Sequence, residues 1–242
     1  MHCVFDGSFD GLMSLVFDTY KSRDSIDMVS IHSGADSLLP TSFFPVNQDK
    51  TRRIKAYIDK KLGAEFAFMV RAAYLSKREE RFRAIVRTLH LSCAMGAGVL
   101  DLLDDEVLSF IACQKEVRWE AHRFMGILRF RQMCDGSLLA VFSPKHNVLT
   151  LVLPHFADRF PEERLLVYDE GRHLAGLSGR GNVDFVEVER LKPLVCLQET
   201  ELQDLWRVFF DHLAIRERFN PRLQQQHLPK YTWKNLTEMQ QR

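Results

Sequence analysis

The sequence lacks the short motifs that mark the common metal, nucleotide and hydrolase sites. Its five cysteines are widely spaced and include no Cys-x-x-Cys pair, which argues against a zinc ribbon, a cysteine-ligated iron–sulfur cluster and a disulfide framework. The sequence also contains no Gly-x-Gly-x-x-Gly, no Walker A loop, no Gly-x-Ser-x-Gly elbow and no His-Glu-x-x-His pattern. We therefore expect the chain to hold no cofactor or metal ion of its own.

Long hydrophobic runs are absent as well. No stretch approaches the roughly 20 consecutive apolar residues that cross a bilayer. The N-terminus lacks the basic region and the apolar run of a signal peptide. An odd number of scattered cysteines is typical of a reducing compartment. These features predict a cytoplasmic protein that makes no membrane contact.

Charge is balanced overall but unevenly distributed. The 242 residues carry 33 basic and 32 acidic side chains, for a net charge of +1. Residues 49–92 have a net charge of +7, residues 158–205 have −5 and residues 206–242 have +4. A basic helical segment and a basic tail are suited to contact the phosphates of a nucleic acid. The alternative is that these charges are solvated and pair with the acidic segment.

Helical periodicity dominates the first half of the sequence. A short N-terminal strand is expected to precede a helix capped by Ser8 or Asp10, and Asp49 is expected to cap a second helix. The other predicted elements of this half are a loop and two helical regions, over residues 33–48, 64–98 (with a break near 75–77) and 103–125.

Alternating hydrophobicity appears in the second half. It predicts five strands, at residues 127–134, 137–143, 165–169, 174–177 and 183–188, and helical spacing returns at 147–160 and 199–216. A run of helices followed by strands indicates the α+β class, with a largely helical front half and a small antiparallel sheet in the rear half. We expect a single α+β domain over residues 1–242, or two lobes: 1–125, mainly helical, and 126–242, mixed α/β.

The densest cluster of polar side chains lies in residues 115–131. On a helix, Arg118 and His122 are four residues apart and share a face, and Glu120 lies within the same turn. A second cluster, after the predicted hairpin, contains His155. Because an imidazole exchanges protons near neutral pH, the candidate catalytic residues are Glu120, His122 and His155. The alternative is that ion pairs of this helix simply hold it against the sheet.

Nucleic-acid contacts are expected from basic and aromatic side chains in these clusters and in the tail. Arginine forms bidentate bonds with phosphate, and tyrosine and tryptophan stack on bases. The candidate nucleic-acid-binding residues are Arg118, Arg123, Arg129, Arg131, His146, Arg159, Lys230, Tyr231 and Trp233. The alternative for the tail is that its aromatic side chains dock on the body of the protein. Asn147 is expected to cap the helix that follows it.

Taken in order, four patches of the sequence resemble a known family. They are Phe5-Asp6-Gly7-Ser8-Phe9-Asp10-Gly11-Leu12; Arg118-Trp119-Glu120-Ala121-His122-Arg123-Phe124-Met125-Gly126 with Arg129-Phe130; His146-Asn147-Val148 with Pro154-His155-Phe156-Ala157-Asp158-Arg159-Phe160; and Asn220-Pro221 with Pro229-Lys230-Tyr231. The chain resembles the DNA metabolism or DNA repair proteins associated with radical-SAM, spore-photolyase-like proteins. That family is also known as a domain of unknown function and occurs joined to some uracil-DNA glycosylase-like domains.

The resemblance implies a bacterial cytoplasmic protein that works on DNA with a radical-SAM partner. It supplies no catalytic residues, and the Cys-x-x-x-Cys-x-x-Cys loop of radical-SAM enzymes is missing, so the iron–sulfur chemistry would belong to the partner. Three hypotheses follow. The first is a DNA-repair accessory protein that contacts nucleic acid, the second is a hydrolase-type enzyme (a nuclease or a glycosylase-like protein), and the third is a scaffold whose polar patches serve folding and a protein interface.

Overall fold

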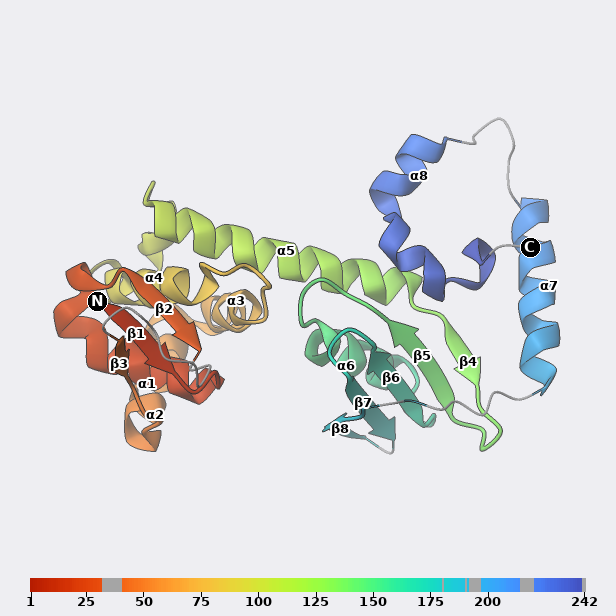
Figure 1. The fold of residues 1–242 in the computed structure, drawn as a ribbon, viewed down its shortest axis with the longest axis horizontal. Coiled ribbons are helices and arrows are strands. Elements are labelled where there is room, and N and C mark those ends of the chain that lie inside the picture. Colours follow the sequence, from red (N-terminus) through yellow and green to blue (C-terminus); the bar gives the residue numbers. More distant parts are fainter. Residues whose placement is uncertain (32–40, 180, 190, 192–196, 214–219, 241–242) are drawn as a thin grey trace. The chain divides into compact units, whose positions relative to one another are not determined.

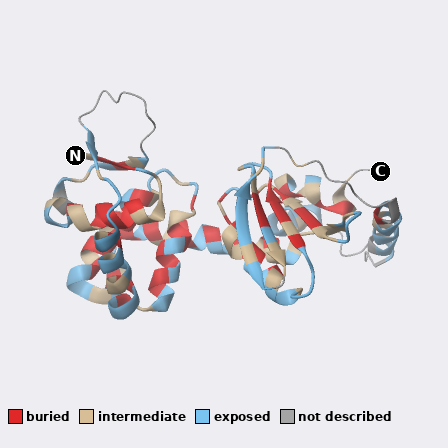
Figure 2. Cartoon of the chain, turned by 90° about the horizontal axis from the view of Figure 1, so that it is seen from below, coloured by how far each residue is buried: buried red, intermediate tan, exposed pale blue. Residues whose placement is uncertain are grey.

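The chain folds into two compact units, Met1–Trp119 and Glu120–Arg242. The computed structural model describes residues 1–31, 41–179, 181–189, 191, 197–213 and 220–240 (Figure 1). Each unit has its own set of buried side chains (Figure 2). The boundary falls inside one long helix, α5 (Asp105–Ile127), which the sequence predicts over 103–125.

The first unit contains a three-stranded parallel sheet in the order β2-β1-β3. The strands are β1 (His2–Phe5), β2 (Met28–Ile31) and β3 (Thr41–Phe43). Only the first strand was predicted, so the front half, expected to be largely helical, also contains a sheet. Strands β2 and β3 are four and three residues long, too short for an alternating pattern to identify.

Helices make up the rest of the first unit, as predicted. They are α1 (Phe9–Thr19), α2 (Gln48–Tyr57) with the turn Ile58–Leu62, α3 (Ala64–Tyr74) and α4 (Arg81–Met95), followed by the first part of α5. The expected break near 75–77 separates α3 from α4. Buried side chains such as Leu12, Phe66 and Phe110 form the core between them.

Two helix starts of the first unit show which residues set the element boundaries. The Ser8 hydroxyl accepts a hydrogen bond from the Gly11 N–H at 2.9 Å and caps α1, as expected. Helix α2 is capped by Asn47 rather than by Asp49, because the Asn47 side-chain oxygen accepts from two N–H groups of the first turn at 3.1 Å each.

The second unit is built on a five-stranded sheet in the order β4-β5-β6-β7-β8. Strands β5 and β6 are parallel and the other neighbours are antiparallel, so the predicted small antiparallel sheet is corrected to a larger mixed one. The strands lie close to the predicted positions: β4 (Phe130–Gln132), β5 (Leu138–Phe142), β6 (Leu165–Asp169), β7 (Leu174–Gly179) and β8 (Asn182–Glu187).

Five described helical segments after β5 accompany this sheet. Helix α6 (Leu149–Arg159) is the crossover between β5 and β6, and it packs on β6 and β7. The others are α7 (Leu197–Leu213), α8 (Pro221–His227) and the short 3₁₀ segments η5 (Lys230–Asn235) and η6 (Thr237–Met239). Residues 214–216 of the predicted last helix and 33–40 of the predicted loop lie outside the described residues.

Helix α7 is joined to the rest of the second unit by side-chain hydrogen bonds. The Glu199 carboxylate accepts from the Gln132 backbone N–H at 3.0 Å, and the Trp206 indole N–H donates to Glu238 at 3.1 Å. Leu205, Val208 and other apolar side chains of α7 are exposed.

Among the described residues, no helix on its own has the length and apolar character to cross a membrane. Taken together, the two helical segments Arg81–Asp101 and Asp105–Ile127, which are bent relative to each other, have the required length and apolar composition. This match rests on length and composition alone.

Close packing of α6 on the sheet depends on Gly176 in β7. A Cβ atom at this position would lie 2.6 Å from a methyl group of Leu153, which is fully buried. We expect Gly176→Ala to lower the free energy of unfolding by about 1–3 kcal/mol, because the overlap forces buried side chains out of place. In the matched control Gly179→Ala, the new Cβ lies 3.6 Å from Arg164, an ordinary contact. Urea denaturation of both variants measures the difference, and equal stabilities would contradict the packing account.

Candidate site at the carboxyl ends of the parallel strands

The only parallel strand pair described in the second unit, β5 and β6, ends at one edge of the sheet. Strand β5 continues into residues 143–146 and β6 into residues 170–172. In sheets with crossover helices, ligands bind outside the carboxyl ends of parallel strands. These two loops, and the segments that touch them, are therefore the candidate site.

A buried carboxylate, Glu120, joins three segments that are far apart in the sequence. Its side chain belongs to α5 and the residue is only 5% exposed. One carboxylate oxygen accepts from the Lys145 backbone N–H at 3.0 Å and from the Tyr231 hydroxyl at 2.7 Å. The other oxygen accepts from the His146 backbone N–H at 2.7 Å. Glu120 thus fixes both the loop after β5 and the η5 segment to α5.

Arg172 holds the same loop from its carbonyl side. Its guanidinium donates to the carbonyl oxygens of Pro144, at 3.1 Å, and Lys145, at 2.6 Å. It also pairs at 2.9 Å with Asp169, whose side chain is fully buried. Burial raises the pKa of Asp169, while the hydrogen bonds from Arg172 oppose that rise. The N–H groups of the loop after β5 therefore donate to Glu120, and the carbonyl groups of the same loop accept from Arg172. The backbone of the loop is thus fixed on both sides.

The η5 segment is attached at two further points. The Lys234 ammonium pairs with Glu170 at 2.6 Å, and Glu170 also accepts from the Ser143 hydroxyl at 2.8 Å. The Lys145 ammonium lies 5.4 Å from the centre of the Tyr231 ring, within the range of a cation–π contact. Burial, and then the hydrogen bond to Glu120, raise the pKa of Tyr231, while the nearby Arg123 opposes this. The phenol therefore remains a hydrogen-bond donor at neutral pH.

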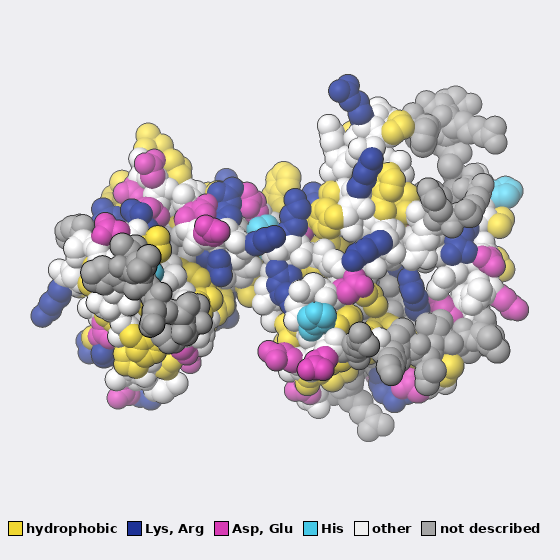
Figure 3. Space-filling view, in the orientation of Figure 1, with side chains coloured by type: hydrophobic (Ala, Val, Ile, Leu, Met, Phe, Trp, Pro, Cys, Tyr) yellow, Lys and Arg dark blue, Asp and Glu magenta, His cyan; other side chains and the backbone are white. Residues whose placement is uncertain are grey.

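The solvent-facing side of this arrangement is cationic. We call Arg123, Lys145, Lys230 and Lys234 the cationic rim. The three lysines are exposed and Arg123 is half-buried. The carboxylates of Glu120 and Asp169 lie beneath the rim and take hydrogen bonds from protein groups. Figure 3 shows Lys and Arg side chains over α8 and the segment that follows it. Such a surface suits an anionic ligand.

The three predicted catalytic residues are not gathered at this edge. Glu120 is buried, and both of its oxygens accept hydrogen bonds from the protein. His122 is exposed two residues further along α5, which turns its side chain about 200° around the helix axis. His155 is exposed on α6 and contacts the Phe156 ring. Because α6 starts near this edge and runs back along the sheet, His155 lies about 9 Å along the helix from residue 149, toward the opposite edge.

The predicted nucleic-acid-binding residues divide into two groups. The residues at the site are Arg123, His146, Lys230 and Tyr231. Tyr231 packs against the body of the protein, which is the alternative considered above for the aromatic side chains of the tail. Four of the others lie elsewhere: Arg118 pairs with Glu65 in the first unit, Arg129 pairs with Glu238, Arg131 lies in β4 and Arg159 is exposed beside Phe160. Trp233 belongs to η5, and its indole N–H donates to the Leu228 carbonyl.

Sequence reasoning missed Lys145, Asp169, Glu170, Arg172 and Lys234. The first four lie at the end of a predicted strand or within three residues of it, which is the signal that an assignment of parallel pairing would have used. The expected Asn147 cap is corrected: Val148 occupies the cap position of α6, and the buried Asn147 side-chain oxygen has no hydrogen-bond partner among the described residues.

A family model for a domain of unknown function, DUF4130, matches residues 79–238. This chain belongs to the DUF4130 family. The expected membership of a family of unknown function is thereby confirmed. The match includes Glu120, both loops of the candidate site and η5. No curated protein and no solved structure matches this DUF4130 protein.

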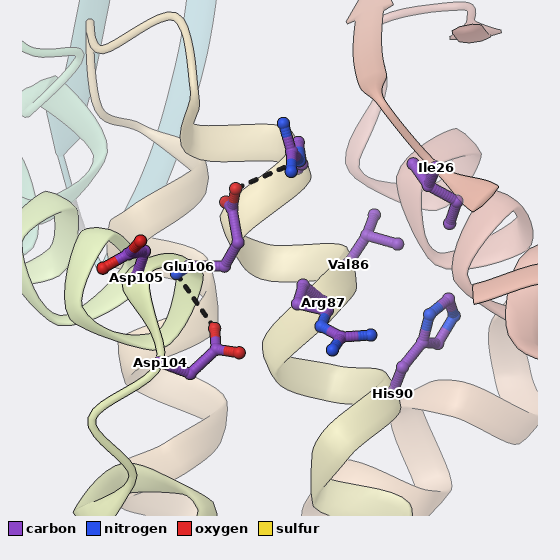
Figure 4. Close-up of a pocket in the computed structure, with 8 residues that line it drawn as sticks. Ile26, Val86, Arg87, His90, Asp104, Asp105 and Glu106 are labelled. Carbon is purple, nitrogen blue, oxygen red and sulfur yellow. Dashed lines mark hydrogen bonds and ion pairs between the residues drawn. The ribbon is translucent and has the colours of Figure 1, made fainter. Parts of the chain in front are cut away.

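The first unit of the DUF4130 protein contains a separate pocket of about 350 Å³ between α4 and the start of α5 (Figure 4). Its lining residues are Ile26, Arg83, Val86, Arg87, His90, Asp104, Asp105 and Glu106. None of them was a candidate site residue, because the acidic residues are separated in sequence from the basic ones. Each group on its own has the pattern of an ordinary charged helix face.

The Tyr231–Glu120 hydrogen bond has a measurable energetic weight. We expect Tyr231→Phe to lower the free energy of unfolding by about 1–3 kcal/mol, because the bond has a charged acceptor and is partly buried. Lys230→Ala, at the neighbouring exposed position, is expected to change stability by less than about 0.5 kcal/mol. Chemical denaturation of the two variants measures both. A stable Tyr231→Phe variant would remove η5 from the set of segments that Glu120 holds.

Alkaline pH gives an independent check of the same bond. The pKa of Tyr231 is raised above its usual value of 10 in the folded state, so the unfolded chain loses this proton first. The stability that Tyr231 contributes is therefore fully present below pH 10 and declines as the pH rises beyond it. We expect the stability difference between the wild type and Tyr231→Phe to shrink as the pH rises from about 10 to about 12. A constant difference across that range would contradict the assignment.

Proposed function

We propose that this DUF4130 protein is a cytoplasmic nucleic-acid-binding accessory factor of DNA repair or DNA metabolism, and that it acts with a radical-SAM, spore-photolyase-like partner. The observation that carries the nucleic-acid part is the cationic rim, where basic side chains from α5, the loop after β5 and η5 lie above neutralised carboxylates. The partner and the repair context rest on the family that the sequence patches resemble.

The chemistry of the rim fits a phosphate backbone. Exposed lysines act as point charges toward phosphate, and each phosphate they neutralise releases a condensed counterion. Lys230 forms no ion pair within the described part of the chain, so its charge is available to a ligand. The fixed backbone of residues 144–146 places Lys145 without an ordering step at the moment of binding, which favours affinity.

The first unit adds a second basic surface. The turn after α2 exposes Lys60 and Lys61, which belong to the segment with a net charge of +7. The hydrolase alternative gains no comparable support. Its proposed carboxylate, Glu120, binds two backbone N–H groups and a tyrosine, which is a positioning role within the fold.

Charge reversal at the rim tests the proposal. Fluorescence anisotropy with single-stranded and duplex DNA, over a range of salt concentrations, gives the affinity and its salt slope. We expect the double variant Lys145→Glu and Lys230→Glu to weaken binding more than about tenfold and to reduce the slope by about 2. The matched control, Arg159→Glu with Arg164→Glu, reverses two exposed charges nearer the amino end of β6 and is expected to bind like the wild type.

Two outcomes count against this function. Wild-type protein without salt-dependent binding would exclude nucleic acid as the ligand, and equal losses in both double variants would mean that the rim is not the binding surface. The partner is tested separately, by co-expression with the spore-photolyase-like protein of the same bacterium. Failure to purify a stoichiometric complex would remove the partner and leave the nucleic-acid result unaffected.

A further inference from the structure

Polar side chains attach helix α7 to the rest of the second unit. The Glu199 carboxylate accepts from the backbone of the edge strand β4, beside which α7 lies in Figure 1. The Arg207 guanidinium donates to the Thr237 carbonyl at 3.3 Å. A surface helix of a globular protein ordinarily buries its apolar stripe and exposes its polar side. In α7 these polar contacts hold the helix, and much of its apolar surface is left in solvent.

Four large apolar side chains form a continuous exposed face along α7. Their exposed fractions are 56% for Leu202, 69% for Leu205, 56% for Val208 and 51% for Phe209. At about 100° per residue, the four positions lie within about 120° of one another around the helix axis. Together they expose on the order of 400 Å² of apolar surface, a patch of the size that marks an interaction site on a soluble protein.

The middle of this face has the spacing of a seam between two helices. Glu201, Leu205, Val208 and His212 follow one another at intervals of four, three and four residues. That is the a/d pattern of helices that pack in pairs. In an antiparallel pair, each a position faces a d position of the other helix. Leu205 of one helix therefore faces Val208 of the other, and Glu201 faces His212.

This pattern is complementary to itself. Both pairings are symmetric about the same point, between residues 206 and 207, so one two-fold axis satisfies all of them at once. Apolar side chains meet in the centre, and a carboxylate meets an imidazole at each end. Glu201 has no ion pair within the described part of the chain. The Nδ1 atom of His212 bonds to the Val208 carbonyl at 2.8 Å, which leaves Nε2 for the carboxylate of a second copy.

The charges around the face disfavour a membrane as the occupant. Helices that lie on a membrane surface carry lysine and arginine beside their apolar face. The side chains that border the apolar face of α7 include the exposed acidic residues Glu201 and Asp204. Asp204 pairs with Arg207 of the same helix at 2.5 Å, so its charge is already balanced when another helix approaches.

We propose that this protein forms a two-fold symmetric dimer in which the exposed face of α7 packs antiparallel on the same face of a second copy. At the usual apolar share of about 60%, an interface built on two such patches buries roughly 1,300 Å² in total, at the low end for specific complexes. The expected affinity is therefore in the micromolar range. The dimer does not rest on nucleic-acid binding at the cationic rim.

Sedimentation velocity of the full chain, between about 1 and 200 µM, measures the association. We expect a monomer–dimer equilibrium with a dissociation constant on the order of 10 µM. Leu205→Glu places a carboxylate in the apolar centre twice per dimer and should weaken association at least about a hundredfold. The matched control is Leu103→Glu, at a leucine of the first unit that is 90% exposed, and it should dimerise like the wild type.

A charge exchange tests the antiparallel register. At about pH 6, where an imidazole is largely protonated, Glu201→Lys sets like charges opposite each other at both ends and should weaken the dimer about fivefold. Adding His212→Glu restores opposite charges, so the double variant should regain the wild-type affinity. A partner other than a second copy would show no such rescue.

Three results would overturn the proposal. The first is a wild-type chain that stays monomeric up to about 200 µM, a concentration well above the expected dissociation constant. The second is a dimer that Leu205→Glu weakens no more than Leu103→Glu does. The third is a double variant that associates as weakly as Glu201→Lys alone. The wild-type measurement and the charge exchange at exposed positions remain decisive even if circular dichroism shows that Leu205→Glu is misfolded.

Discussion

The arrangement of the second unit depends on one buried carboxylate, Glu120, which accepts three hydrogen bonds from the protein. A carboxylate removed from water is strongly destabilising unless hydrogen bonds replace its hydration. Glu120 receives two backbone N–H groups and a tyrosine hydroxyl, all at 3.0 Å or less. Each donor comes from a different place in the chain than α5 itself. The need to satisfy Glu120 therefore becomes a constraint that brings the loop after β5 and the η5 segment to the same helix.

The same constraint separates fixed groups from available ones. The carboxylates of Glu120 and Asp169 lie beneath the surface and are neutralised by protein donors, whereas Lys145 and Lys230 are exposed. The exposed Glu170 pairs with Lys234. Local charge is thus positive even though the chain as a whole has a net charge of +1. Net charge alone is a poor guide to the local charge of a surface when some of the opposing charges are neutralised inside the fold.

Much of the local structure could be predicted from the sequence, and most of the long-range structure could not. The cap at Ser8, the break between α3 and α4, and the positions of β5 and β6 follow from local chemistry and periodicity. The pairing direction of β5 with β6 does not, because it is set by where α6 packs. Glu120 was singled out as a candidate catalytic residue, but its bonds within the fold were not foreseen, since two of its donors are backbone groups that carry no sequence signature and the third, Tyr231, is far away in the sequence. Arg172 was missed because its acceptors are carbonyl groups, present at every residue.

Glu120 and Tyr231 are separated by 111 positions in the sequence, so their bond closes a very long loop. Closing such a loop carries an entropic penalty that only the completed sheet can offset, and contacts of this kind form late in folding. They are also the first to open when a segment detaches without global unfolding. The basic surface is therefore a property of the fully assembled unit, and amide hydrogen exchange in residues 230–235 reports directly on whether that surface exists at a given moment.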